Sequence, residues 1–170
     1  MSENKDGISN QLTNIRAKEL IKLEKHLKDD KTSYDAPYFG ESIRIQFEAN
    51  KPCEYSFLLT LREGNRVSSM ELELRKFTMG TLASIYMLIR VDIGPDSLRH
   101  INPDGELILG SHVHLYDEKY GDKYAFRLTD KNGFYQVKES DSQDISLIFD
   151  KFSQYCNLDD NLIINWRLGV

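Results

Sequence analysis

The sequence predicts an α+β domain in which helices flank a mostly antiparallel sheet of about six or seven strands. Apolar residues recur with helical spacing near both ends of the chain, and through its middle they alternate with polar residues at a period of two. Turn-forming Asn, Asp, Gly and Pro residues separate the alternating segments. With 170 residues, 40% of them hydrophobic, the chain is long enough for one domain with its own core, so we expect a single domain over residues 1–170.

The first element expected is a helix. A short polar tail over residues 1–7 precedes a broad apolar stripe among lysines and glutamates, which predicts an amphipathic helix over residues 8–30. His26 lies on this segment and is typical of a surface histidine. Residues 31–40 are rich in aromatic residues and contain Pro and Gly, and we expect a loop there.

The sheet is expected over residues 42–137. Alternation predicts strands that begin near Ser42 and Tyr55, and a further hairpin strand with Met70, Leu72 and Leu74 on one face. The segment 85–93 is apolar on both faces, which is typical of a central strand, and Arg90 and Asp92 fall on one face of it. Later strands follow over 107–117 and from Tyr124.

The C-terminal part predicts a second helix. Capping residues over 140–144 precede a helical apolar spacing, so we expect a helix over residues 142–157 with Cys156 on its inward face. Residues 162–166 are apolar and follow a break, which predicts a short edge strand.

Composition narrows the classes of function. The net charge of −5 and the pI near 5.4 disfavour direct binding of nucleic acid and suit docking on a basic protein. The chain has no apolar run of 18 residues and no signal pattern, so we expect a cytoplasmic protein without membrane contact. Its two cysteines lie far apart in the sequence, which favours reduced thiols.

Three histidines form the centre of the functional prediction. His112 and His114 are two residues apart, so in a strand both imidazoles point to the same face. His100 lies twelve residues before His112, just ahead of the turn-forming segment 102–105. A turn there carries His100 back toward the other two histidines.

This pattern predicts a divalent metal site, with zinc as the ion that suits imidazole and thiolate ligands best. His100, His112, His114 and Cys156 together form a closed, structural site, in which zinc performs no chemistry. An oxygen ligand from Asp92, Asp104 or Glu106 is an alternative to the thiolate, and an open position allows activation of water. Glu106 and Asp122 are then the candidates for a general base, and Arg90 with Asp92 forms either a structural ion pair or a support for an imidazole.

The segment from Arg90 to Cys156 resembles an uncharacterised family of small proteins from Gram-positive bacteria, their phages and mobile elements. Five motifs carry the resemblance: Val91-Asp92-Ile93, His100–Gly105, His112–Tyr116, Tyr120–Tyr124 and Tyr155-Cys156-Asn157. The size, acidity and expected zinc site are also similar to those of zinc-containing anti-CRISPR proteins of type II-A. That second resemblance implies a non-enzymatic inhibitor that binds the type II CRISPR RNA-guided nuclease and keeps target DNA out.

Three functions therefore remain open. The first is a zinc-stabilised inhibitor of the type II CRISPR nuclease from a mobile element, which is what the second resemblance implies and the function that we favour. The second is a metal-dependent hydrolase acting on nucleic acid or nucleotide, which uses the same histidines around an open site. The third is an antitoxin or immunity protein that neutralises a basic toxin.

Overall fold

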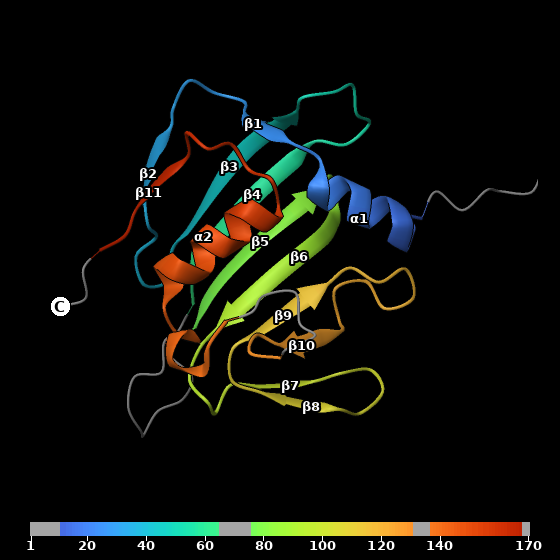
Figure 1. Cartoon of the computed structure of the whole chain (residues 1–170), viewed down its shortest axis with the longest axis vertical. Coiled ribbons are helices and arrows are strands. Elements are labelled where there is room, and N and C mark those ends of the chain that lie inside the picture. The colour runs from blue at the N-terminus through green and yellow to red at the C-terminus, as the bar shows by residue number, and fades with distance from the viewer. Residues whose placement is uncertain (1–10, 65–75, 131–136, 168–170) are drawn as a thin grey trace, which may run out of the picture.

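The computed structural model describes residues 11–64, 76–130 and 137–167. Its centre is a seven-stranded antiparallel sheet, with helix α1 (Asn14–Lys22) before it in the chain and helix α2 (Ile145–Tyr155) after it (Figure 1). This confirms the predicted α+β class. Across the sheet the strands follow in the order β1 (Lys25–Leu27), β3 (Ser42–Ala49), β4 (Phe57–Glu63), β5 (Phe77–Ala83), β6 (Tyr86–Ile93), β9 (His112–Leu115) and β10 (Ala125–Arg127).

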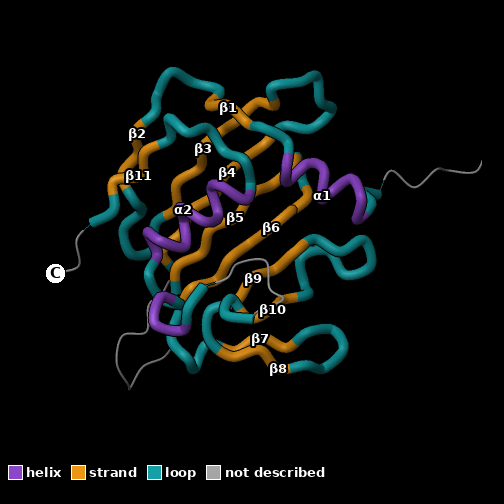
Figure 2. Tube along the Cα trace, in the orientation of Figure 1, coloured by secondary structure: helices purple, strands orange, loops and turns teal. Residues whose placement is uncertain are grey.

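The two faces of the sheet differ in what covers them. On one face Ile45, Leu59, Val91 and Val113 are buried in a core that includes side chains of both helices. Figure 2 shows α1 and α2 on this same side of the strands. We call it the covered face. The residues that alternate with these point the other way, onto what we call the open face.

The early strands form where the alternation predicts them. Strand β3 pairs with β4, so that Ile45 lies opposite Leu59 and Arg44 opposite Thr60. The strand expected around Met70, Leu72 and Leu74 lies outside the described residues. Strand β5 was not predicted, because small and polar residues such as Thr78, Gly80 and Thr81 interrupt its apolar pattern.

Strand β6 confirms the predicted central strand, with one difference at its start. The pairing of β5 with β6 shifts between Thr81 and Leu82 of β5. Because of this shift, the side chains at the start of β6 point to the opposite face from the one that strict alternation predicts. Ile85 lies in the turn before the strand and is 84% exposed. Ile89 and Val91 point to the covered face as expected, while Arg90 and Asp92 share the open face.

The predicted helix over residues 8–30 is too long at both ends. Residues 8–10 lie outside the described residues, α1 begins only at Asn14 after its N-cap Thr13, and the prediction is wrong beyond Lys22. Helix α1 ends there, and β1 follows as an edge strand that pairs with β3. The reason is Lys25, whose buried ammonium donates hydrogen bonds to the carbonyls of Ile21 and Leu23 at 2.9 and 2.7 Å. The side chain thereby satisfies carbonyls that a continued helix would have used.

The C-terminal part of the chain forms as predicted. The carboxylate of Asp144 accepts a hydrogen bond from the backbone N–H of Leu147 and caps α2, which follows a short 3-10 helix, η1 (Glu139–Asp141). The expected edge strand is β11 (Ile163–Asn165), and it pairs in parallel with β2 (Ser33–Asp35) in a separate two-stranded sheet. Strand β2 lies within the segment expected to be a loop. In the described residues no helix is long and apolar enough to cross a membrane.

A small hairpin beside β10 completes the fold. Strands β7 (Arg99–Ile101) and β8 (Leu107–Leu109) are joined by the predicted turn, where Gly105 has a φ of 91° that suits glycine. Figure 1 shows this hairpin next to β9 and β10, at the edge of the main sheet. It brings His100 back toward β9.

Candidate metal site

Strand β9 places two imidazoles side by side on the open face. His112 lies opposite Asp92 of β6 and Arg127 of β10, and His114 lies opposite Arg90 and Ala125. Because β9 is paired on both sides, the backbone holds the two histidines in a fixed register. Both are buried, each with 1% of its surface exposed. The predicted same-face arrangement is therefore present.

The β7–β8 hairpin supplies the third imidazole, and side chains fix it to the sheet. The amide of Asn102 donates a hydrogen bond to the carbonyl of Ala125 at 2.9 Å and accepts one from the backbone N–H of Ala125 at 2.8 Å. The hydroxyl of Tyr124 donates to the carboxylate of Asp104 at 2.7 Å. These bonds account for the motif residues around the turn: they hold the hairpin so that His100 reaches β9.

The three rings pack against one another. Their centroids lie 4.6 Å apart for His100 and His114, 5.0 Å for His112 and His114, and 5.5 Å for His100 and His112. One ring nitrogen from each lies within 4.8 Å of the other two, so the three can bind one ion. We call them the histidine cluster.

Backbone carbonyls assign the tautomers of two of the rings. The Nε2 atom of His100 lies 2.9 Å from the carbonyl of Lys123, and the Nδ1 atom of His112 lies 2.8 Å from the carbonyl of Gly110. A carbonyl can only accept, so each of these nitrogens carries the proton. The other nitrogen of each neutral ring then has a free lone pair. Metal-binding histidines are held by such bonds to their second nitrogen.

His114 has a buried nitrogen without a partner. Its Nδ1 atom makes no hydrogen bond in the structure, although the ring is fully enclosed. Its Nε2 atom lies 3.1 Å from Nη2 of Arg90 and 3.5 Å from Oδ2 of Asp92. If Nε2 carries the proton of the ring, this N–H faces Asp92 and Nδ1 keeps a lone pair. If Nε2 instead accepts a hydrogen bond from Arg90, the proton is on Nδ1, which is buried and has no acceptor. Burial lowers the pKa of His114, which keeps the imidazole neutral and able to bind a metal.

Asp92 lies against two rings of the cluster. Its Oδ2 atom is 3.5 Å from the Nε2 atoms of both His112 and His114, and 3.0 Å from Nζ of Lys76. The hydroxyl of Thr78 donates to its Oδ1 atom at 2.9 Å. Burial on its own would raise the pKa of Asp92, but the adjacent imidazoles and the nearby cations hold that pKa well below its usual range. Asp92 is therefore a carboxylate that can orient the ring of His114 and that lies beside the metal-binding nitrogen of His112.

Sequence reasoning proposed Asp92 and missed two residues that hold it. Lys76 and Thr78 sit on the strand beside β6, and neither belongs to a recognisable motif. Only the pairing of Thr78 with Asp92 in the register of β5 and β6 brings them to the site. Lys76 and Thr78 could have been found from the sequence only if β5 had been predicted as a strand beside β6.

The structure does not bring Cys156 to the cluster, which corrects the prediction of a fourth, thiolate ligand. Cys156 ends α2 and belongs to the core on the covered face, next to Thr81 of β5. The imidazoles of His112 and His114 are on the open face, so the sheet separates them from the thiol. Burial also raises the pKa of Cys156 to about 12, despite the nearby charge of Lys25. The helical spacing predicted its inward orientation correctly but gave no information on which face of the sheet is inward.

The other candidate carboxylates have different positions. Asp104 accepts from Tyr124, and Glu106 lies 3.4 Å from the amide of Asn102, so both belong to the hairpin. Asp122 forms an ion pair with Arg90, whose other terminal nitrogen contacts His114. Asp122 is thus the candidate base that is connected to the cluster.

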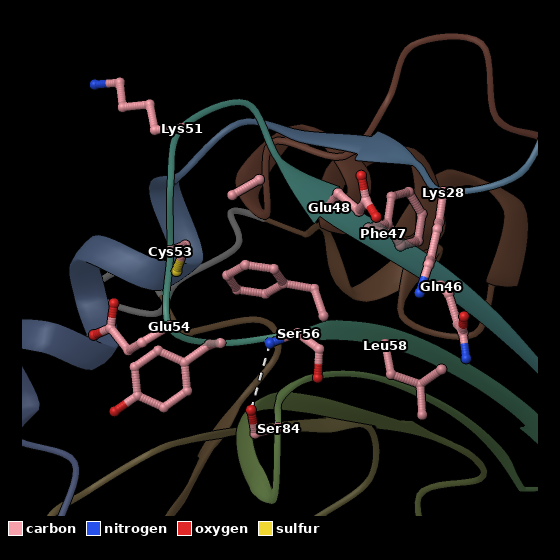
Figure 3. Close-up of a pocket in the computed structure, with 13 residues that line it drawn as sticks. Lys28, Gln46, Phe47, Glu48, Lys51, Cys53, Glu54, Ser56, Leu58 and Ser84 are labelled. Atoms are coloured by element: carbon pink, nitrogen blue, oxygen red, sulfur yellow. Dashed lines mark hydrogen bonds between the residues drawn. The ribbon is translucent and has the colours of Figure 1, made fainter.

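The remaining histidine and the remaining cysteine lie elsewhere. The side chain of His26 is 53% exposed beside Glu24, as expected for a surface histidine. Cys53 lines a separate hollow of about 590 Å³ at the β1–β3–β4 end of the sheet (Figure 3). None of the described residues that line this hollow is a histidine, so it is distinct from the cluster.

Fold and site together define a small α+β protein with a three-histidine cluster on the open face of an antiparallel sheet. The chain belongs to the family of unknown function DUF6978, whose model matches residues 12–158. This agrees with the resemblance to an uncharacterised family and extends it over the N-terminal half, where the motifs gave no match. No curated protein and no solved structure matches the chain.

Proposed function

We propose that the histidine cluster binds one divalent ion, with zinc as the preferred metal. The observation that carries this is the buried Nδ1 atom of His114, which has no hydrogen-bond partner among otherwise satisfied imidazoles. A metal at that nitrogen removes the penalty of about 1–3 kcal/mol for an unsatisfied buried polar group. Lone pairs on His100 and His112 point to the same conclusion, since carbonyls occupy their other nitrogens.

Three imidazoles favour zinc because nitrogen ligands suit this ion and three protein ligands are typical of its catalytic sites. The fourth position is then open to water or substrate, because Cys156 lies on the covered face. Asp92 is the one carboxylate placed to approach it. A site of this kind serves chemistry rather than folding.

The reaction class that we propose is hydrolysis of an ester assisted by the metal. When bound, the ion supplies Lewis acidity and lowers the pKa of a water molecule. Asp92 orients the imidazole of His114. Arg90 contributes positive charge for an anionic group of the substrate, and Asp122, held by Arg90, is the candidate base.

The test combines metal content with catalysis. Protein purified with zinc is compared with His114→Ala and with His26→Ala, whose histidine is exposed and far from the cluster. We expect one zinc per chain in the wild type and in His26→Ala, with little or none in His114→Ala. Hydrolysis of bis(p-nitrophenyl) phosphate should follow the metal content. Equal zinc in all three proteins would refute the site, and a zinc-loaded wild type without hydrolysis would refute the reaction class.

A second candidate function is inhibition of a type II CRISPR nuclease, and one observation favours it. The carboxylate of Asp159 accepts a hydrogen bond from the backbone N–H of Leu27, which brings Asp159 and Asp160 next to β1. Asp29 and Asp30 follow β1 after Lys28 and precede Lys31, so four acidic residues lie in the two segments at this edge of the sheet. Such a patch is complementary to the basic channel of the nuclease.

This candidate has its own experiment. Asp29→Asn combined with Asp30→Asn removes charge without touching Asp159, which bonds to the backbone. If the patch binds the nuclease, the wild type blocks binding of target DNA at low salt and the double variant does so far less. If the wild type has no effect on target binding, this candidate is excluded.

A further inference from the structure

The open face carries a concentration of positive charge that the net charge of the chain conceals. The register places four arginines and a lysine on it, which we call the arginine face: Arg44, Arg62, Lys76, Arg90 and Arg127. In the described strands of the main sheet, only Glu48 and Asp92 bring negative charge to the same side. The chain as a whole has a net charge of −5. Charge is therefore segregated between surfaces.

Most of this positive charge has no ion-pair partner among the described residues. Lys76 pairs with Asp92 and Arg90 with Asp122. Arg44, Arg62 and Arg127 are exposed and form no ion pair with any residue in the described part of the chain. Exposed guanidinium groups are suited to phosphate, which they contact with two parallel hydrogen bonds.

The spacing of these arginines fits a chain of phosphates rather than one. Arg62 of β4 and Arg127 of β10 lie at the two ends of one row of paired residues across the sheet. The residues between them in this row are Thr78, Asp92 and His112. Four inter-strand spacings separate them, which is about 19 Å. A single phosphate cannot contact both ends of this row. A phosphodiester backbone can. Asp92 and His112 in the middle of the row are buried, so such a chain meets the histidine cluster at His100, its partly exposed ring.

The hollow in Figure 3 extends the same face. Gln46 and Leu58 line it, and they follow Arg44 and Thr60 on the open side of β3 and β4. Phe47, Tyr55 and Phe57 also line it, and its charged lining residues are Lys28, Glu48, Lys51 and Glu54. A volume of about 590 Å³ with an amide and an aromatic ring accommodates an unstacked base. Bases are unstacked in a single strand and not in a duplex.

We infer that the arginine face binds single-stranded nucleic acid, with phosphates on the arginines and a base in the hollow. The low pI, which argued against binding of nucleic acid, reports the charge averaged over the whole surface and not the charge of one face. This inference deepens the proposed function: it names the substrate whose phosphodiester reaches the histidine cluster. Binding itself requires the arginines and not the metal.

The experiment measures fluorescence anisotropy of a labelled single-stranded oligonucleotide against zinc-loaded protein over a range of salt concentrations. The test variant is Arg44→Gln with Arg62→Gln. Its matched control is Lys18→Gln with Lys138→Gln, which removes equal charge from exposed positions on α1 and before η1. We expect the arginine variant to bind about tenfold more weakly at low salt, with a salt slope smaller by about two. The control should bind as the wild type does.

Three results would overturn the inference: no binding by the wild type at low salt, equal loss in the lysine control, or equal affinity for a duplex or for inorganic polyphosphate. Zinc content and hydrolysis of bis(p-nitrophenyl) phosphate are measured on the same proteins. Both should be unchanged in the arginine variant, since Arg44 and Arg62 do not touch the histidines. Failure of binding with intact zinc and hydrolysis thus refutes the arginine face alone, whereas a wild type that binds the oligonucleotide but takes up no zinc refutes only the metal site.

Discussion

Asn102 and Ala125 exchange two hydrogen bonds, side chain to backbone in both directions, at 2.9 and 2.8 Å. The pair joins the β7–β8 hairpin to β10 of the main sheet. Because His100 is two residues before Asn102, this junction sets the position of the third imidazole. The asparagine of the His-x-Asn-Pro-Asp-Gly motif is therefore a positioning residue for the cluster.

Asn102→Ala should weaken both the fold and the metal site. Two buried backbone groups of Ala125 lose their partner, which lowers the free energy of unfolding by about 2–4 kcal/mol. The affinity for zinc should fall about tenfold or more, since His100 is no longer held. Urea denaturation and competition with a chelator measure the two effects. Asn161→Ala, at an exposed loop position, is the control and should change neither; an unchanged zinc affinity in Asn102→Ala would contradict the positioning role.

Asp92→Asn tests whether the carboxylate orients the imidazoles or binds the ion. As an orienting group its loss should reduce zinc affinity by about 10–100-fold and leave a stoichiometry of one zinc per chain at saturating metal. Titration followed by metal analysis measures both quantities. Complete loss of zinc at saturation would instead make Asp92 the fourth ligand.

Cys156→Ala should keep its zinc, because the thiol lies on the covered face. At neutral pH the free energy of unfolding should fall by about 1 kcal/mol through lost packing. In the unfolded wild type the thiol ionises near its ordinary pKa of 9.0, while burial raises the folded value to about 12. The folded state retains the proton between these values, so the wild type loses about 1.4 kcal/mol per pH unit above 9 relative to the variant.

Urea denaturation of both proteins at about pH 8 and above pH 9 follows this difference. The wild type should be the more stable protein at the lower pH, and its advantage should shrink as the pH rises. A thiol reagent gives a second measurement: Cys53 should react in the folded protein and Cys156 should not. Zinc lost from Cys156→Ala would reverse the assignment of the site.

Lys25→Met should destabilise the fold about as much as Asn102→Ala. The Lys25 ammonium donates to three backbone carbonyls, those of Ile21, Leu23 and Cys156, at 2.7–2.9 Å. Methionine fills similar space but leaves these acceptors unsatisfied, so we expect a loss of about 2–4 kcal/mol. Thermal and urea denaturation measure it, with the exposed Lys18→Met as control. A loss below about 1 kcal/mol would show that water replaces the ammonium.

The strands and the histidine pair could be predicted from the sequence because a period of two is a local property. The alternation in β6 and β9 placed Arg90, Asp92, His112 and His114 on their faces correctly. The turn at Gly105 likewise predicted that His100 folds back. Each of these inferences needs only neighbouring residues.

What the sequence could not supply depended on contacts between distant parts of the chain. The end of α1 is decided by Lys25, which also bonds to a residue 131 positions later. Cys156 was assigned to the wrong face because helical spacing does not specify which side of the sheet a helix covers. The free nitrogen of His114 depends on Arg90 and Asp92 of the neighbouring strand β6, which contact the other nitrogen of the ring.

Contacts across the whole chain also bear on the order of folding. The Lys25 bond to Cys156 and the parallel pairing of β2 with β11 both join segments that are about 130 residues apart. A chain that emerges from the ribosome cannot complete its N-terminal half until nearly all of it has been synthesised. Such long-range closure slows folding, because the entropy of a large loop is lost before the contacts form. The β7–β8 hairpin and β9, whose contacts are local, can form earlier, so the histidines are assembled before the core closes behind them.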